Sequence, residues 1–244
     1  MSLCSNSSIW QPLPWDSDFL GFPVARLTAF GQPAAAVSAA IAEARQAGFR
    51  LLYIVGGPAD AMLAAVAQAA GAWLADRKVT FAMPLLPDSA SQLSSAIGTA
   101  VSYSPQLESL AWQSGEYSRF RLDAHFGPDV FRGLYSQWLR NSLSGDIARR
   151  VLIWQNLDGH ELGLLTLGEK NGRANIGLLA VDAAARGQRV GQQLVAAAQA
   201  QASVWGCTEL QVVTQRNNEP ACRFYEKYGF RLTHEEHIYH LWLK

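Results

Sequence analysis

Residues 176–192 read Ile-Gly-Leu-Leu-Ala-Val-Asp-Ala-Ala-Ala-Arg-Gly-Gln-Arg-Val-Gly-Gln. We predict that this stretch contains the end of a strand over 174–181 and, after a short loop, the start of a helix over 191–205. The first amides of a helix have no partner inside it, and they lie at the positive end of its dipole. Gly187 and Gly191 let a ligand approach the backbone closely. The stretch therefore predicts an anion site suited to a diphosphate, although such turns also occur as purely structural connections.

A second motif follows the strand that we predict over 209–214. Asn218, Ala221, Tyr225, Gly229 and Phe230 form an Asn-x-x-Ala-x-x-x-Tyr-x-x-x-Gly-Phe series. Asn218 can cap the next helix and keep its side chain near a ligand. Tyr225 lies one turn beyond Ala221 on the same face, so its hydroxyl can point back towards the strand ends. Taken alone, Tyr225 and Phe230 are more simply explained as core aromatics.

Together, the two motifs resemble the GNAT acetyltransferase superfamily over roughly residues 105–244. The resemblance implies that acetyl-CoA is the co-substrate, with its diphosphate in the glycine-bearing loop and its pantetheine arm along the preceding strand. It also implies that Tyr225 is catalytic, as the general acid that protonates the departing thiolate. The implied acetyl-CoA-binding residues are Leu179, Ala180, Val181, Arg186, Gly187, Gln188, Arg189, Val190, Gly191, Gln192 and Asn218.

Two positions depart from the family pattern. Arg189 stands where the loop usually has glycine, and Asn175 stands where many members have a glutamate that serves as base. Asn cannot take a proton, so water or another residue has to do so. Glu116, Asp123 and His125 lie in the segment that family members fold beside the acceptor. Each is more simply explained as an exposed loop residue, and none is assigned a catalytic role.

A narrower likeness extends across nearly the whole chain. Residues 15–21 (Trp-Asp-Ser-Asp-Phe-Leu-Gly), residues 117–121 (Tyr-Ser-Arg-Phe-Arg) and the pair Thr214-Gln215 are similar to dTDP-fucosamine N-acetyltransferases. Those enzymes acetylate the 4-amino group of a nucleotide-linked deoxysugar, and a truncated GNAT-like domain precedes their catalytic domain. The likeness therefore implies that the acceptor is a small-molecule amine, with a nucleotide-linked aminosugar favoured.

Arginines and tryptophans offer candidate contacts for such an acceptor. Arg119 and Arg121 can clamp a diphosphate, because a guanidinium fork matches phosphate oxygens. Trp10, Trp15 and Trp112 can stack on a base or a sugar. A solvated loop and ordinary core tryptophans explain the same residues, so both interpretations stay open.

The order of predicted elements indicates an α/β fold with a mixed α+β sheet and two domains. Residues 1–85 form a small α/β domain, which the likeness implies is partly GNAT-like. A stretch rich in Ser and Pro links it, over 86–104, to a catalytic domain over 105–244. The predicted strands are 24–30, 51–55, 78–83, 151–155, 162–167, 174–181, 209–214 and 237–243, and the predicted helices begin at Pro33, Pro58, Leu107, Phe131, Gly191 and Pro220.

Composition and charge limit the class of protein. The 244 residues are 49% hydrophobic and 16% charged, which excludes a disordered or collagenous chain. Twenty basic residues balance twenty acidic ones, so no overall field attracts nucleic acid or an anionic membrane. Cys4, Cys207 and Cys222 have no metal-ligand spacing and predict free thiols, with no metal. No basic residue precedes Arg26, so we expect no signal peptide and a cytoplasmic protein.

Other functions stay open at this point. The acceptor amine could belong to a peptide or an antibiotic, and the oligomeric state is undecided, with a homodimer as one option. A non-catalytic acyl-CoA-binding module is favoured by Arg189 and Asn175 and disfavoured by Tyr225. A dinucleotide site at 56–58 is disfavoured, because the Gly-x-Gly-x-x-Gly fingerprint is incomplete and Pro58 lacks an N–H.

Overall fold

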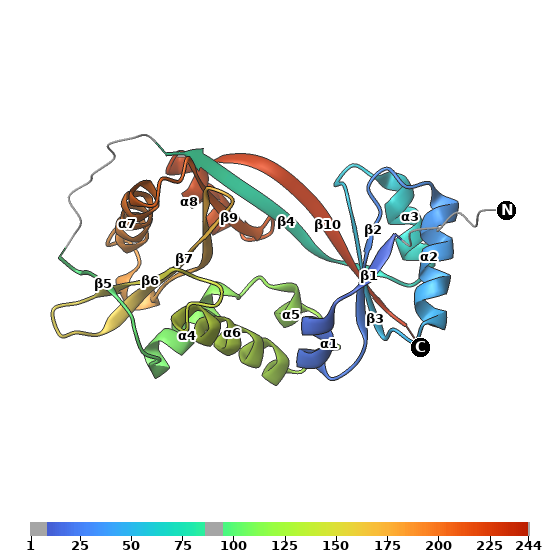
Figure 1. Cartoon of the computed structure of the whole chain (residues 1–244), viewed down its shortest axis with the longest axis horizontal. Helices are drawn as coiled ribbons and strands as arrows, with labels where there is room; N and C mark the ends of the chain where they lie inside the picture. Colours follow the sequence, from blue (N-terminus) through green and yellow to red (C-terminus); the bar gives the residue numbers. More distant parts are fainter. Residues whose placement is uncertain (1–8, 86–94, 244) are drawn as a thin grey trace. The chain divides into compact units, whose positions relative to one another are not determined.

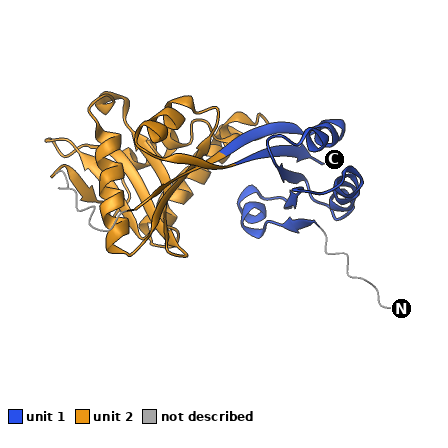
Figure 2. Cartoon of the chain, turned by 90° about the horizontal axis from the view of Figure 1, so that it is seen from above, with its two compact units in different colours: residues 1–78, 235–244 blue, residues 79–234 orange. Residues whose placement is uncertain are grey.

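The computed structural model describes residues 9–85 and 95–243, which form two compact units. One unit consists of residues 1–78 with 235–244, and the other of residues 79–234 (Figure 2). The division differs from the one expected above, in which the second domain takes the whole chain from 105 onwards. The reason is that the last strand pairs with a strand of the first unit. Residues 86–94 of the expected linker lie outside the described residues.

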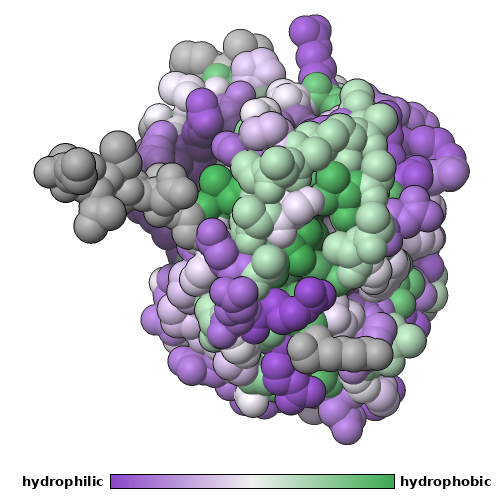
Figure 3. Space-filling model, turned by 90° about the vertical axis from the view of Figure 1, so that its right-hand side faces the viewer, coloured by the Kyte–Doolittle hydropathy of each residue, from purple (hydrophilic) through white to green (hydrophobic). Residues whose placement is uncertain are grey.

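The first unit is a sheet covered by two alanine-rich helices. Its elements are β1 (Trp10–Pro12), α1 (Pro14–Leu20), β2 (Val24–Thr28), α2 (Ala34–Gln46), β3 (Leu51–Gly56), α3 (Ala61–Ala69), the start of β4 (Trp73–Pro84) and most of β10 (Arg231–Trp242). β2 pairs in parallel with β3, and β10 pairs antiparallel with β3, from His237 opposite Gly56 to Trp242 opposite Leu51. Val37, Ile41 and Leu63 of the helices are buried in this core. The solvent face of α2 carries exposed alanines, and Figure 3, a view from that side, shows an apolar patch surrounded by hydrophilic residues.

Local chemistry explains where the sequence prediction of this unit failed. α3 begins after Asp60 and not at Pro58, because the Asp60 carboxylate accepts the Leu63 N–H (2.8 Å) and caps the helix. β1 and α1 are too short to produce a periodic pattern, and the sequence prediction missed both.

The second unit is a mixed sheet with helices on both faces (Figure 1). Its strands follow the order β4-β9-β8-β7-β6-β5. The predicted antiparallel meander β6-β7-β8 is confirmed, and Asn171 and Gly172 turn the β7–β8 hairpin with φ of 55° and 72°. The other elements are β5 (Ile97–Thr99), α4 (Pro105–Ser114), α5 (Arg119–Leu122), α6 (Pro128–Leu143), β6 (Arg150–Gln155), β7 (Glu161–Lys170), β8 (Arg173–Val181), a 3-10 turn (Ala183–Ala185), α7 (Val190–Val204), β9 (Glu209–Gln215) and α8 (Glu219–Lys227).

The core of the second unit lies between the sheet and α7. Leu165, Leu167 and Ile176 of the strands pack with Leu194 and Val195 of α7. α4 and α6 lie on the opposite side of the sheet from α7 (Figure 1). The spacing of Phe131, Leu134, Trp138 and Leu139 in the sequence predicts one buried face for α6. The prediction is wrong for Trp138 alone, which is 39% exposed, while the other three are buried.

Candidate active site

The two central strands of the second unit separate part of the way along. β8 and β9 pair in parallel from Arg173 opposite Glu209 to Ile176 opposite Val212, and the pairing ends there. The rest of β8, residues 177–181, is therefore unpaired on its β9 side. A cavity of about 140 Å³, here called the cleft cavity, lies at this divergence and is lined by residues of both strands.

A β-bulge in β8 sets which way its side chains point at the divergence. Leu165 is opposite Leu179 and Leu167 is opposite Ile176, so two residues of β8, Gly177 and Leu178, face one residue of β7. The Leu178 N–H donates to the Thr166 hydroxyl (2.8 Å) and fixes the bulge. A Cβ at position 177 would lie 2.7 Å from the same oxygen, so glycine is required there. A bulge of this kind re-aims the following side chains.

The loop after β8 presents free amides to solvent. α7 has no side-chain cap, and within the described part of the chain no partner accepts the N–H groups of Gly187, Arg189, Val190, Gly191 and Gln192. Gly187 has a φ of 80°, which suits glycine. These amides lie at the positive end of a helix dipole beside a cavity of about 290 Å³, here called the loop cavity. The chemistry of this donor set fits a diphosphate.

Arg189 takes a left-handed conformation with a φ of 62°, which glycine adopts with less strain than any residue that has a Cβ. We expect Arg189→Gly to leave the free energy of unfolding within about 1 kcal/mol of wild type, because relief of strain offsets the added freedom of the unfolded chain. Arg189→Val is expected to lower it by about 1–3 kcal/mol, since a β-branched residue resists positive φ. Urea unfolding gives the free energy of unfolding of both variants. Equal values for the two would contradict the claim that the backbone is strained at this residue.

Tyr225 faces the divergence from α8. It is buried, and burial raises the pKa of its phenol well above the ordinary value. Its ring contacts Phe81 and Phe230, with centroids 5.8 and 5.5 Å away. Within the described residues the hydroxyl makes no hydrogen bond, and the side chain lines both the cleft cavity and a larger cavity of about 380 Å³, the Tyr225 cavity. A protonated phenol is thus held at an open space.

Asn218 caps α8 as expected. Its side chain accepts the Ala221 N–H (3.3 Å), and it lines the same two cavities as Tyr225. The structure brings the predicted residues together around the Tyr225 and loop cavities, with the exception of Gln188, whose side-chain amide donates to the Ala184 carbonyl (3.0 Å) within the turn.

Several residues that the sequence reasoning missed also line the Tyr225 cavity. Gln113, Ser114 and Tyr117 come from the end of α4 and the loop after it, and Phe224 precedes Tyr225. Gln113 donates to the Asp182 carboxylate (3.2 Å), which ties α4 to the start of the loop, and this bond helps to lower the pKa of Asp182. Tyr117 belongs to the stretch 117–121 quoted above, and Gln113 and Ser114 are marked only by the helical pattern of α4. The sequence therefore assigned none of them a role at the site.

Other candidates lie in different surroundings. Asp123 is 1% exposed, so its prediction as an exposed loop residue is wrong, and it accepts from the His125 ring (2.8 Å). Glu116 is exposed as expected and lines the Tyr225 cavity. The Arg121 guanidinium lies over a phenylalanine ring, and the Trp112 indole donates to a backbone carbonyl. These last two contacts are structural.

Trp10 and Trp15 belong to the first unit, where each contacts a phenylalanine ring. Arg119 stacks on Phe120, with its guanidinium 4.7 Å from the ring centroid. None of these contacts involves the Tyr225 cavity or the loop cavity.

Residues 9–85 and 95–243 contain no cluster of three or more His, Cys, Asp and Glu side chains that could hold a metal ion. Cys207 and Cys222 are buried free thiols, and burial raises the pKa of both; Cys4 lies outside the described residues. In the same part of the chain, no helix has the length and apolar character needed to cross a membrane.

Comparison with known proteins places these features in a family. The model of the Acetyltransferase (GNAT) family matches residues 108–230. The chain is 29% identical over 220 residues to a dTDP-fucosamine acetyltransferase of Escherichia coli O6:H1. This alignment covers 90% of this chain and 92% of that protein. It is also 29% identical over 133 residues to the spore coat polysaccharide biosynthesis protein SpsD of Bacillus subtilis, covering 54% of this chain and 45% of that protein.

Solved structures show the same fold. A GCN5-related N-acetyltransferase from Sphaerobacter thermophilus aligns over 95% of this chain and 75% of its own, with a TM-score of 0.60 and 15% identity. A tandem GNAT protein from the clavulanic acid biosynthesis pathway aligns over 90% of this chain and 75% of its own, with a TM-score of 0.55 and 17% identity. The predicted mixed α/β fold is confirmed. Because the family match covers just over half of the chain and includes the cleft, Tyr225 and loop cavities, the chain belongs to the GNAT acetyltransferase family and is an acyltransferase.

Proposed function

We propose that the protein transfers an acetyl group from acetyl-CoA to a primary amine of a small molecule, and that the favoured acceptor is a nucleotide-linked aminosugar. The observation that carries the proposal is the meeting of three features in one place: free amides at the start of α7, the unpaired edge of β8, and the Tyr225 phenol. Together they offer a diphosphate site, a track for the pantetheine arm and a proton donor.

The direction of the β8 amides supports a site for the thioester oxygen. Successive N–H groups along a strand point to alternate edges. The N–H groups of Leu178 and Asp182 both point towards β7, where they donate to Thr166 and Leu162. The Leu179 amide therefore points to the opposite edge, into the divergence. We assign it, ahead of Ala180, to stabilise the negative charge that develops on the thioester oxygen.

In the proposed reaction a neutral amine attacks the thioester carbon. A nitrogen–carbon bond forms, and the carbon–sulfur bond breaks. Tyr225 gives its proton to the sulfur and becomes a phenolate. The attacking nitrogen loses a proton to water, and a proton from water finally returns to the phenolate. Asn175 cannot serve as the base, so the acceptor has to arrive largely deprotonated or lose its proton to a bound water.

The favoured acceptor class is supported by the relatives. The dTDP-fucosamine acetyltransferase is similar over nine-tenths of both chains, and the SpsD protein is named for polysaccharide biosynthesis. The experiment is a panel of amines assayed by thiol release from acetyl-CoA: dTDP-4-amino-4,6-dideoxygalactose, free aminosugars, a peptide N-terminus and an aminoglycoside. We expect the sugar nucleotide to have the highest kcat/KM by at least tenfold. A higher value for the peptide or the aminoglycoside would overturn the acceptor class, and saturable acetyl-CoA binding without any transfer would favour a binding module.

A further inference from the structure

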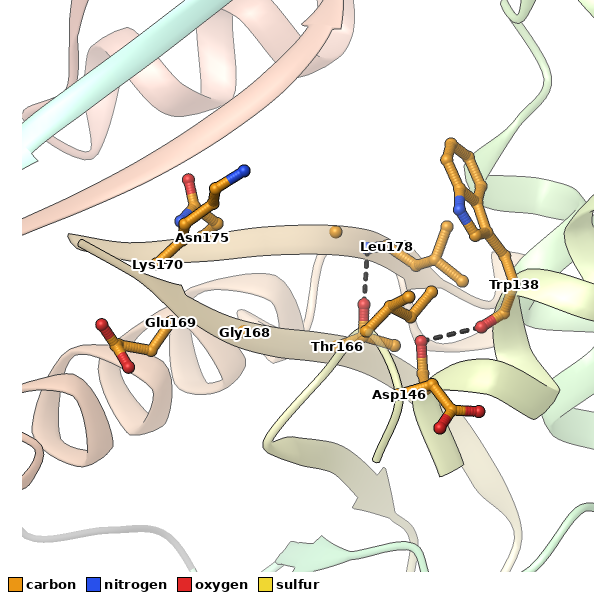
Figure 4. Close-up of a pocket in the computed structure, with 11 residues that line it drawn as sticks. Trp138, Asp146, Thr166, Gly168, Glu169, Lys170, Asn175 and Leu178 are labelled. Atoms are coloured by element: carbon orange, nitrogen blue, oxygen red, sulfur yellow. Dashed lines mark hydrogen bonds between the residues drawn. The ribbon is translucent and has the colours of Figure 1, made fainter. Parts of the chain in front are cut away.

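A further cavity adjoins the site described above. It has a volume of about 560 Å³ and lies over the β7–β8 hairpin, beside the end of α6 (Figure 4). We call it the hairpin cavity. Trp138 from α6 and Lys170 and Asn175 from the hairpin lie around it (Figure 4).

Glycines form the floor of the hairpin cavity. In the register of the hairpin, Gly168 is opposite Asn175, and Gly177 lies two residues beyond Asn175 on the same face of β8. A Cβ at position 168 would lie 3.0 Å from the Ile147 carbonyl oxygen. The two glycines leave this face of the hairpin open beside the short Thr166 side chain, while its opposite face, with Leu167 and Ile176, is packed in the core.

The hairpin cavity adjoins the cleft cavity. Trp138, Gly177 and Leu178 line both, and the cleft cavity is also lined by Leu179 and Tyr225. A molecule lying in the hairpin cavity can thus extend one end into the divergence, where the transfer is proposed to occur. The distance along β7 from Leu165, the partner of Leu179, to Lys170 is about 17 Å, at about 3.3 Å per residue.

Lys170 supplies the positive charge at the far end of this cavity, and Glu169, which also lines it, is paired with an arginine. The neighbouring arginines are engaged: Arg149 pairs with Glu169 (3.3 Å) and Arg173 with Glu209 (3.5 Å). Among residues 9–85 and 95–243, no carboxylate pairs with Lys170, which occupies the last paired position of a tight hairpin, opposite Arg173. Its ammonium is therefore available to an anion, on a rigid support.

Trp138 presents a fixed aromatic surface at the other end. Its ring packs edge-on against Tyr135, with centroids 5.2 Å apart and planes at 87°. Tyr135 in turn packs directly on the backbone of Gly115, where an added Cβ would lie only 2.2 Å from the Tyr135 ring. The indole is thus held by its neighbours although 39% of the residue is exposed. A flat apolar surface with nearby polar groups is typical of a ligand pocket.

We propose that the hairpin cavity binds the glycosyl diphosphate part of the acceptor. The sugar ring lies against Trp138 with its amine in the divergence, and the diphosphate lies at Lys170, within hydrogen-bond reach of the Asn175 amide. The inference rests on the proposed function and adds two residues, Trp138 and Lys170, that determine which amines are accepted. The order of groups along the cavity matches the order of groups in such an acceptor. The Trp138 indole, next to the catalytic cleft, faces the sugar, and the Asn175 amide and the Lys170 ammonium, farther along, face the diphosphate.

Lys170→Ala tests the diphosphate end. We expect the KM for dTDP-4-amino-4,6-dideoxygalactose to rise at least fivefold, with kcat and the KM for acetyl-CoA within twofold of wild type, because only the anionic part of the acceptor loses a contact. The KM for a free aminosugar should not change. Arg45→Ala is the matched control, since it removes one positive charge from an exposed position on α2 of the first unit. An unchanged KM for the sugar nucleotide in Lys170→Ala would overturn the assignment.

Trp138→Leu tests the sugar end, and it should raise the KM for the free and the nucleotide-linked aminosugar alike. Circular dichroism and the melting temperature show whether the variant is folded.

Calorimetry with dTDP-glucose, which has no acceptor amine, separates this inference from the proposed function. We expect wild type to bind dTDP-glucose and Lys170→Ala to bind it at least fivefold more weakly. If no amine is acetylated but dTDP-glucose binds in this way, the proposed function fails and the cavity assignment stands. If wild type does not bind dTDP-glucose, the cavity assignment fails.

Discussion

Replacing Tyr225 by phenylalanine is expected to lower kcat at least tenfold at neutral pH while leaving the affinity for acetyl-CoA nearly unchanged. The phenol is the group that can give a proton to the departing thiolate, and proton donation by a positioned side chain contributes about a hundredfold or more. The ring contacts with Phe81 and Phe230 remain in the variant, so its fold should be preserved. Thiol release at saturating acetyl-CoA and acceptor gives kcat, and calorimetry gives the affinity.

Tyr228→Phe is the matched control for this experiment. Tyr228 lies at the end of the same helix and lines none of the three cavities that Tyr225 and the loop line. Its hydroxyl bonds to the Gln192 backbone carbonyl and the Gln199 side chain, both at 3.2 Å. We expect its kcat within twofold of wild type. Desolvation disfavours the phenolate and raises the pKa of Tyr225, so the proton donor stays protonated in alkaline assays. Equal activity of Tyr225→Phe and wild type would remove Tyr225 from the mechanism.

Gly191→Glu is expected to weaken acetyl-CoA binding at least tenfold, which corresponds to about 1.4 kcal/mol. The new carboxylate would lie among the free amides at the start of α7 and compete with the diphosphate for them. The space above Gly191 is limited, since an added Cβ would already contact Phe224 at 3.5 Å. Titration calorimetry measures the loss, and the stabilisation of the melting temperature by acetyl-CoA should disappear with it.

Val204→Glu controls for charge on the same helix. Val204 is 80% exposed at the other end of α7, far along the helix from the loop. The variant carries the same added charge, and its acetyl-CoA affinity should match wild type. If Gly191→Glu binds acetyl-CoA as tightly as Val204→Glu does, the diphosphate lies elsewhere, although the chain belongs to the family.

The sequence predicted the elements whose signals are local. The β6-β7-β8 meander has two turns rich in Asp, Asn and Gly, and α7 follows a glycine-bearing loop; both occur where expected. β10 was predicted as a strand, yet its pairing with β3 depends on contacts between distant parts of the chain, which no local pattern encodes. For the same reason, the sequence did not indicate that residues 235–244 belong to the first unit. The partly GNAT-like character of the first unit stays a prediction.

The candidate site shows the same limit. The loop amides and Asn218 follow from motifs, because helix starts and caps are local features. The bulge at Gly177 and Leu178 was not predicted, since it appears only when β7 and β8 are paired. The hairpin cavity depends on side chains that are absent, at Gly168 and Gly177, and on a tryptophan that the helical pattern placed in the core. The roles of Tyr225 and of the loop residues are proposals to be tested by the variants above.

The pairing of β10 with β3 also concerns how the protein is made. During synthesis the strand that completes the first sheet leaves the ribosome long after β1, β2 and β3 have emerged. Until then β3 has an exposed edge, which another chain can pair with. The first unit therefore cannot reach its final form before β10 has emerged, and the interval before that is the stage at which aggregation, or binding by a chaperone, competes with folding.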